Sequence, residues 1–174
     1  MSRYQLNPQK YLTPNEEADL RRLLPKLSER DSLYFEVLLE TGARLNEGLN
    51  ILSTDLISER CSVFLRGLKG SNDREVAIPP ALFNRLNRYC IGRDRPFPFS
   101  DANADRIWRL IRPVKKKLHS LRHTFAINTL KRTRRVELVQ YALGHRNIAN
   151  TMIYLDYERA EEFRAAMFNF KQAL

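Results

Sequence analysis

Leucine residues recur at helical spacing near the start of the chain. Leu20, Leu23, Leu24 and Leu27 lie three or four residues apart and so share one face of a helix. The preceding "TPNE" at 13–16 supports a helix start, because a capping threonine is followed by a proline at the first helical position and, three residues after the threonine, by a glutamate. The pattern predicts an amphipathic helix.

Two more helices are expected before the pattern changes. Asp31 can cap the first of them, and Gly42 can end it. A short helix follows directly, with Leu45, Leu49 and Leu52 on one face.

The hydrophobic period then changes from helical to extended. "CSVFLR" (61–66) and "REVAI" (74–78) are rich in Val, Ile and Phe, and the intervening "GLKGSND" has the Gly, Asn and Asp of a turn. We expect an antiparallel hairpin here. A helix can open at Pro79–Pro80, and later helical patterns cover 102–112, 120–132, 135–143, 148–155 and 158–170.

These elements predict a mainly α fold with a small antiparallel β-sheet (α+β). A chain of 174 residues can bury its own core, and no repeat or linker divides it. We expect a single domain over 1–174, with an N-terminal extension at 1–11, a core at 12–157 and a C-terminal helix at 158–174.

Composition narrows the class of protein. No run approaches the roughly 20 apolar residues that span a bilayer, so no membrane is expected. Cys61 and Cys90 lack metal-ligand spacing, which indicates packed thiols in a reducing, cytoplasmic compartment. Glu16–Glu17 and Glu161–Glu162 fall on helix surfaces, so we expect no metal and no other cofactor.

Positive charge is concentrated in one segment. Residues 106–135 hold 11 of the 30 Lys and Arg residues and no acid, which leaves 30 − 11 = 19 bases against 20 acids elsewhere. A solvated helix face is the ordinary explanation, but such clustering favours a nucleic-acid binder. The residues expected to contact DNA are Arg112, Lys115, Lys116, Lys117, Arg132, Arg134 and Arg135.

Two cations lie where the chain turns. Arg44, at the start of the third helix, lies beside backbone N–H groups and can hold an anion, or it can simply bond Glu47 one turn along. Lys69, near the hairpin tip, can reach into a groove or donate a proton, or it can only add solubility. Taken alone, each side chain is better explained by the second interpretation.

Histidines and tyrosines occur later in the chain. His119 and Arg122 are three residues apart and share a helix face. His123 is rotated by about 100° from Arg122 and is assigned a structural role. In "LGHRNIANTMIYLDY", the expected packing stripe is Ile148, Met152 and Leu155, with Tyr154 on its flank and Tyr157 nearly opposite.

Together these stretches resemble the catalytic domain of the tyrosine recombinases, the phage integrase family. The resemblance runs from about Leu12 to Tyr157 and rests on "GARLNE", "LKGSNDREVAIP", "HSLRHTFA", "LGH" and a tyrosine 154 − 145 = 9 residues after that histidine. It selects Tyr154 over Tyr157. The catalytic residues that it implies are Arg44, Lys69, His119, Arg122, His145 and Tyr154.

Some features depart from the family pattern. The interval from Arg44 to His119 is short, and Leu155–Asp156 replaces a common Thr-His pair. Most members also have a separate N-terminal DNA-clamping domain, which we do not expect in this chain. The chain is then either a compact single-domain recombinase or a fragment.

The resemblance implies a site-specific DNA recombinase that breaks and rejoins strands without metal or ATP. Arg44 and Arg122 would bind the phosphate oxygens, with a further hydrogen bond from His145. His119 would accept the proton of Tyr154, and the hairpin lysine would protonate the departing 5′ oxygen. The intermediate is a 3′-phosphotyrosyl ester, whose reversal needs no ATP.

The expected partner is double-stranded DNA, bound mainly through phosphates and therefore in a salt-dependent way. The resemblance also implies self-association into a tetramer on paired DNA sites, in the cytoplasm of a prokaryote or of a viral host. The last helix contains Phe163, Met167, Phe168 and Phe170, and it either packs on its own core or docks on a neighbouring protomer.

Two other functions stay open. A type IB topoisomerase-like enzyme shares the cleavage and religation steps but does not exchange DNA partners. A regulatory or architectural DNA-binding module would have lost catalysis, and the complete set of polar residues speaks against it. A metal-dependent nuclease is the least favoured.

Overall fold

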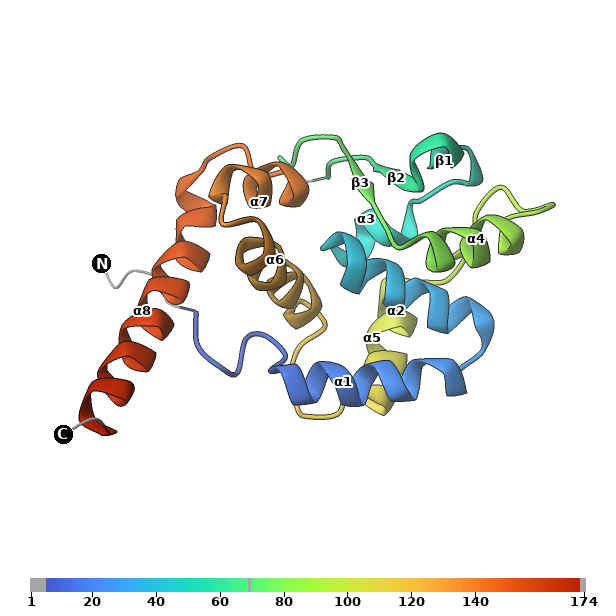
Figure 1. Cartoon of the computed structure of the whole chain (residues 1–174). Helices are drawn as coiled ribbons and strands as arrows, with labels where there is room; N and C mark the ends of the chain where they lie inside the picture. Colours follow the sequence, from blue (N-terminus) through green and yellow to red (C-terminus); the bar gives the residue numbers. More distant parts are fainter. Residues whose placement is uncertain (1–5, 69, 173–174) are drawn as a thin grey trace.

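The computed structural model describes residues 6–68 and 70–172, with side chains to residue 168. A small sheet lies at one side of a body of helices (Figure 1). The α-helices are α1 (Pro14–Leu23), α2 (Glu29–Thr41), α3 (Leu45–Leu49), α4 (Pro80–Tyr89), α5 (Asp101–Ile111), α6 (Ser120–Thr133), α7 (Val136–Leu143) and α8 (Ala149–Gln172). The strands are β1 (Leu56–Ile57), β2 (Ser62–Leu65) and β3 (Arg74–Ala77). The predicted fold class is confirmed.

Helix ends largely follow the signals in the sequence. Thr13 and Glu16 form the expected capping box of α1, and Gly42 ends α2 with a φ of 63°, a left-handed conformation that glycine adopts at little cost. The expected cap of α2 was wrong. Ser28 occupies that position, and its Oγ accepts a hydrogen bond from the backbone N–H of Asp31 at 3.3 Å.

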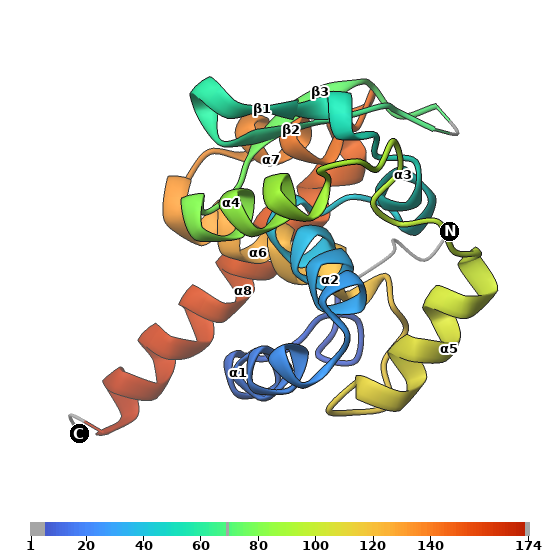
Figure 2. The same ribbon diagram turned by 90° about the vertical axis from the view of Figure 1, so that its right-hand side faces the viewer.

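The sheet contains the predicted hairpin and one further strand. In the antiparallel pair of β2 and β3, Ser62 lies opposite Ala77 and Leu65 lies opposite Arg74. No signal in the sequence pointed to β1, which is two residues long and pairs with β2. The preceding α3 ends at Leu49, so Leu52 lies in the link to the sheet and not in the helix. Figure 2 shows the sheet lying over α7.

The core is built around α2, which lies between α4 and α1 in Figure 2. Leu33, Tyr34, Phe35 and Val37 are completely buried in it. Helix α6 packs against α2 so closely that a Cβ atom on Gly42 would lie 2.3 Å from the ring of Phe125. The end of α2, and with it the start of α3, is therefore fixed against α6.

The C-terminal part of the chain is one helix and not two. Helices were expected at 148–155 and 158–170, but α8 is continuous over Ala149–Gln172. Neither Gly nor Pro interrupts this stretch, so nothing in it breaks the helix.

The packed face of α8 also differs from the expected one. Thr151, Tyr154 and Glu158 are buried, whereas Ile148 is 42% exposed. The expected stripe was wrong because polar residues on α8 find partners inside the protein: Glu158 accepts a hydrogen bond from Arg134 at 2.5 Å. Hydrophobic periodicity does not reveal a face that is buried through polar contacts.

The distal part of α8 extends away from the body of the protein (Figures 1 and 2). Phe163, Met167 and Phe168 are 66%, 40% and 62% exposed. The interpretation in which these side chains pack on their own core was therefore wrong.

The expectations about membrane spans and about the two cysteines can also be compared with the structure. None of the described helices has the length and apolar character that crossing a membrane requires. Cys90 is buried and Cys61 is half-buried, and both are unpaired thiols.

Candidate active site

The candidate site begins with Arg44, which is the capping residue of α3. Its Nη1 donates hydrogen bonds to Glu47 Oε1 at 3.0 Å and to Ser71 Oγ at 2.7 Å. Its backbone N–H also donates to Glu47, at 2.9 Å. The ordinary interpretation of Arg44, a bond to Glu47 one turn along, therefore describes a real contact, but the contact is part of a larger set.

Glu47 is the centre of that set. Its side chain is completely buried and accepts a hydrogen bond from Arg74 Nη2 at 2.7 Å, while Arg122 Nη1 lies 3.8 Å from it. Burial alone raises the pKa of this carboxyl, but the Arg74 hydrogen bond and the charges of Arg74 and Arg122 bring it down to about 2. We call Arg44, Arg74 and Arg122 around Glu47 the arginine cluster. Three cations around one carboxylate leave a surplus of positive charge.

Arg122 lies in α6 and is 2% exposed. Its Nη1 donates to the carbonyl of Gly42 at 2.7 Å and its Nη2 to the carbonyl of Leu143 at 2.6 Å. These bonds use two of the five N–H groups of a guanidinium. Burial, followed by the charge of Arg44, lowers the pKa of Arg122 to about 9, so an anion beside it would stabilise its charged form.

His145 directly follows Gly144, the residue that ends α7. Its Nδ1 lies 2.9 Å from Thr151 Oγ1 on α8. Burial and the positive charge of Arg122 and Arg44 lower the pKa of His145 to about 4. At neutral pH the imidazole is therefore uncharged and can donate a hydrogen bond through one ring nitrogen.

Tyr154 projects from α8 into the protein. Its side chain is 2% exposed, and its hydroxyl lies 2.9 Å from His123 Nδ1. Burial, His119 and Arg122 lower the pKa of His123 to about 3, so this ring is neutral at pH 7. The expectation that Tyr154 lies on the flank of a packed stripe was wrong, because the whole side chain is buried.

His119 does not make the contact that His123 makes. Its side chain lies at the protein surface, and its ring meets the ring of His123 edge-on, with centroids 4.8 Å apart. Partial burial and the charges of Arg122 and Arg44 lower its pKa. His119 thus contacts His123, and His123 in turn contacts the hydroxyl of Tyr154.

Tyr157 has a different environment. Its hydroxyl is hydrogen bonded to that of Tyr11, and the two rings pack edge-on with centroids 5.1 Å apart. Burial and this hydrogen bond raise its pKa. Of the two tyrosines, Tyr154 is the one that lies with the histidines.

Lys69 lies outside the described residues. The adjoining part of its loop is fixed at the site: Ser71 is 5% exposed, and the backbone N–H of Asn72 donates to the carbonyl of Gly144 at 2.9 Å. The structure therefore brings together Arg44, Arg122, His119, His145 and Tyr154 from α3, α6, α8 and the turn after α7.

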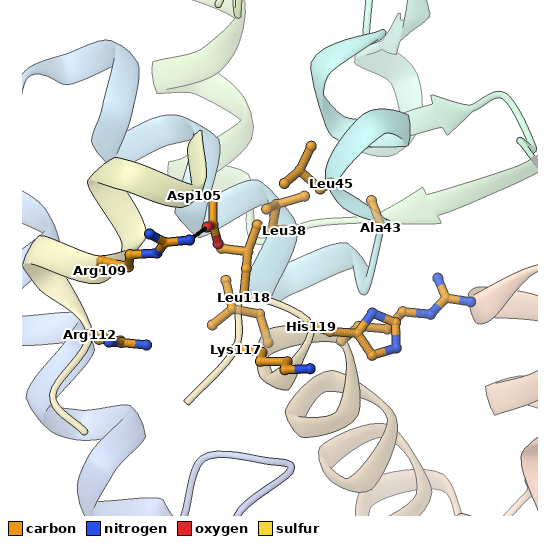
Figure 3. Close-up of a pocket in the computed structure, with 11 residues that line it drawn as sticks. Leu38, Ala43, Leu45, Asp105, Arg109, Arg112, Lys117, Leu118 and His119 are labelled. Atoms are coloured by element: carbon orange, nitrogen blue, oxygen red, sulfur yellow. Dashed lines mark hydrogen bonds and ion pairs between the residues drawn. The ribbon is translucent and has the colours of Figure 1, made fainter. Parts of the chain in front are cut away.

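A pocket of about 450 Å³ opens at this site. Figure 3 shows His119 at one side and Arg109 and Arg112 at the other, with Leu38 and Leu118 between them. Arg122 also lines it. One acid, Asp105, contributes to the lining and is paired with Arg109. The pocket has an apolar floor and a mainly cationic rim.

Several of the expected DNA-binding cations have partners within the protein. Lys116 needs correction: it is 8% exposed, and its Nζ bonds the carbonyl of Tyr11 and the carboxylate of Glu16, so it is structural. Arg134 pairs with two glutamates of α8, and Arg135 pairs with Glu137. Four of the expected DNA-binding residues lie at or near the surface without such ion pairs: Arg112, Lys115, Lys117 and Arg132.

Sequence reasoning overlooked three residues of the site. His123 was assigned a structural role from its angle to Arg122, but it is four residues after His119, and that spacing places both histidines on one side of α6. Glu47 was considered only as a partner of Arg44. Arg74 had no signal, since a charged residue in a strand gives no indication of burial.

Among the described residues, no group of three or more His, Cys, Asp and Glu side chains is close enough to hold a metal ion. The arrangement instead offers fixed cations, neutral imidazoles and one phenol. Such groups can stabilise negative charge and transfer protons.

Comparison with known proteins places the chain in a family. Residues 10–161 match the sequence model of the phage integrase family, and the chain belongs to that family. It is 32% identical over 161 residues to the tyrosine recombinase XerA of Pyrococcus furiosus, an alignment that covers 83% of this chain and 56% of that protein. The chain spans about half the length of the curated relatives that it matches.

Solved structures show the same fold. The catalytic domain of bacteriophage HP1 integrase matches with a TM-score of 0.70 and 24% identity, over 91% of this chain and 94% of that one. A XerH site-specific recombinase bound to a palindromic difH substrate matches with a TM-score of 0.75 and 23% identity, over 92% of this chain and 53% of that one.

Proposed function

We propose that this chain is the catalytic part of a site-specific DNA recombinase, which breaks and rejoins strands through a covalent bond between Tyr154 and a 3′ phosphate. The observation that carries the proposal is the convergence of Arg44 and Arg122 on the buried Glu47, next to the buried phenol of Tyr154. Family membership and the DNA-bound state of the similar XerH recombinase support it.

The first task of such a site is to stabilise negative charge. Charge grows on the non-bridging oxygens of a phosphodiester as a nucleophile attacks, and preorganised donors there lower the barrier. Arg44 and Arg122 would bind these oxygens, with His145 as a further donor. Glu47 and the backbone carbonyls that bind the guanidinium groups fix them before DNA arrives, so little reorganisation is needed.

The second task is to make the phenol nucleophilic. Tyrosine titrates near pH 10, so a base has to take its proton at neutral pH. A neutral imidazole can do so: His123 contacts the hydroxyl, and His119 lies next to His123. Because Tyr154 is 2% exposed, attack on DNA also requires α8 to shift and present the hydroxyl.

The remaining steps concern the leaving group and the reverse reaction. Lys69, in the hairpin loop, would protonate the departing 5′ oxygen. The phosphotyrosyl ester would then be attacked by the 5′ hydroxyl of another strand, which restores a phosphodiester and the phenol. Each step exchanges one phosphate ester for another, so neither ATP nor a metal is required.

DNA would bind along the cationic rim of the pocket and the neighbouring surface. Arg112, Lys115, Lys117 and Arg132 are the proposed phosphate contacts, with Arg134 and Arg135 available if their glutamates release them. Recombination needs two paired sites, and we propose a tetramer there, assembled in part through the exposed Phe163 and Phe168. The expected location is the cytoplasm, where prokaryotic DNA lies.

The test is to trap the covalent intermediate on DNA. A pool of duplexes with a randomised core is nicked beside that core, so that the short strand released by cleavage diffuses away and cannot be rejoined. Adducts are separated on a denaturing gel in excess EDTA, and their DNA is sequenced to give a preferred duplex. We expect the unaltered chain to form adducts.

Two variants with the same chemical change identify the nucleophile. Tyr154→Phe should form no adduct, whereas Tyr157→Phe, one turn along α8, should form it at a near-normal rate. Adducts that persist in Tyr154→Phe would refute the assignment. DNA binding without any adduct would favour the regulatory module, and supercoil relaxation without strand exchange between paired sites would favour the topoisomerase.

A further inference from the structure

Ser71 links parts of the site that come from three separate elements. It lies in the loop between β2 and β3, is 5% exposed, and its Oγ accepts a hydrogen bond from Arg44 Nη1 at 2.7 Å. The same hydroxyl shares its one hydrogen between two backbone carbonyls, that of Gly144 at 3.1 Å and that of Leu143 at 3.4 Å. A serine hydroxyl is suited to this place because it can accept and donate at once.

The carbonyl of Leu143 is shared with the second arginine. Arg122 Nη2 donates to it at 2.6 Å. A short series of contacts therefore runs from Arg44 through the Ser71 hydroxyl to the Leu143 carbonyl and on to Arg122. Both guanidinium groups are positioned against the same few atoms.

The loop between β2 and β3 is packed tightly against the turn at Gly144, which restricts the position of Ser71. Gly144 has a φ of 67°, and a Cβ atom there would lie 2.6 Å from Ser71 Oγ and 2.7 Å from the carbonyl oxygen of Asn72. On the other side of the loop, a Cβ on Gly67 would lie 2.2 Å from the carbonyl oxygen of Ser71. Ser71 is thus confined between two backbone segments.

We propose that Ser71 is a positioning residue for the recombination reaction: its hydroxyl sets the place of Arg44 relative to Arg122 and to the turn that carries His145. The proposal rests on the function proposed above. Ser71 need not touch DNA, since it acts through Arg44. Because a reacting group displaced by about 1 Å can cost a large part of the rate, one hydroxyl is sufficient to matter.

The variant Ser71→Ala removes this link with little other damage. The Leu143 carbonyl keeps its bond from Arg122, and the Gly144 carbonyl keeps its bond from the Asn72 N–H. The Nη1 group of Arg44 keeps its hydrogen bond to Glu47 but loses the second of its two acceptors, the one at 2.7 Å. The folded state should therefore persist, with a less ordered Arg44.

The experiment compares single-turnover adduct formation by the unaltered chain, by Ser71→Ala and by Ser62→Ala. Ser62 is the matched control, because it is another buried serine of the same hairpin and bonds a carboxylate, Glu75. We expect Ser71→Ala to lower the cleavage rate about ten- to a hundred-fold with DNA affinity nearly unchanged. Ser62→Ala should keep the rate and change only thermal stability.

A second substrate separates positioning from general damage. In a methylphosphonate at the cleaved position, a methyl group replaces one non-bridging oxygen, so less negative charge has to be stabilised. The deficit of Ser71→Ala should shrink several-fold on this substrate if it arises from a misplaced Arg44. An equal deficit on both substrates, or a normal rate on the phosphodiester, would overturn the proposal. If the unaltered chain itself forms no adduct, the proposed function fails instead, and Ser71 loses its role with it.

Discussion

The two halves of the candidate site are built in opposite ways. The arginine cluster is fixed by hydrogen bonds to a buried carboxylate and to backbone carbonyls at the ends of α2 and α7. The tyrosine half belongs to α8, a helix whose distal part contacts little else and whose phenol is enclosed beside His123. The proposed phosphate-binding groups are thus preorganised, whereas the proposed nucleophile is buried.

This difference matches the demands of the proposed chemistry. Electrostatic stabilisation is most effective when donors do not move during the reaction. A nucleophile that is enclosed until DNA binds cannot attack other phosphates. The comparison can be tested by weakening each half separately.

The largest effect is expected for Arg44→Ala. Removing one preorganised donor at a developing negative charge typically costs about 10²–10³ in rate. The measurement is single-turnover adduct formation on the selected duplex. Arg85→Ala is a suitable control, because Arg85 has similar exposure and pairs with a glutamate, Glu36, away from the site. Equal losses in the two variants would mean that the arginine cluster is only structural.

The next effect concerns the base in the tyrosine half. His123→Gln should slow adduct formation about 10²-fold, the usual contribution of a positioned base, because the imidazole that contacts the phenol is lost. His119→Gln should cost less, since its ring reaches Tyr154 only past His123. The reverse order of rates would assign proton transfer to His119.

A smaller effect is expected in the pH dependence of stability. The pKa values of His123 and His145 are about 3 and 4 in the folded chain against 6.5 when unfolded, so the unfolded state takes up protons first as the pH falls. The free energy of unfolding should be fully present above pH 6.5 and decline below it, by at most about 1.4 kcal/mol per pH unit for each histidine. Urea denaturation between pH 7 and about pH 5, above the range of most carboxyls, measures the slope.

The control for this slope is the double variant with glutamine at both histidines. Its unfolding free energy should change less over the same pH range than that of the unaltered chain. Parallel curves for the two proteins would show that these histidines are not the source of the dependence.

The smallest effect is expected for Tyr11→Phe. This change removes the hydroxyl contact between the N-terminal segment and Tyr157 of α8, which is worth about 1 kcal/mol. Thermal unfolding should shift slightly, and adduct formation by Tyr154 should be almost unchanged. A large fall in adduct formation would show that the N-terminal segment controls the tyrosine half.

Much of the fold could be predicted because its signals are local. The capping box at Thr13, the glycine stop at Gly42 and the hairpin all depend on residues that are close in the chain. The continuity of α8 was missed because amphipathic spacing does not show where one helix ends and another begins when no breaker lies between them.

The site could be anticipated in part through its resemblance to a family and less well through its geometry. Arg44, Arg122 and His145 were predicted residues, and the structure places them together. Arg74 could not be predicted, since its burial follows from the meeting of β3, α3 and α7 and not from any local pattern. Lys116 was misassigned for the related reason that its partners are about 100 residues away in the sequence.

The unbroken course of α8 has a mechanical consequence. A helix of 24 residues is about 36 Å long and has no joint between Tyr154 and its far end. A force applied near Phe168 is therefore transmitted along the whole helix. A small tilt of α8 at that end displaces the phenol of Tyr154. A partner that binds the projecting end of α8 would therefore also move Tyr154, the proposed nucleophile, and so control its exposure to DNA.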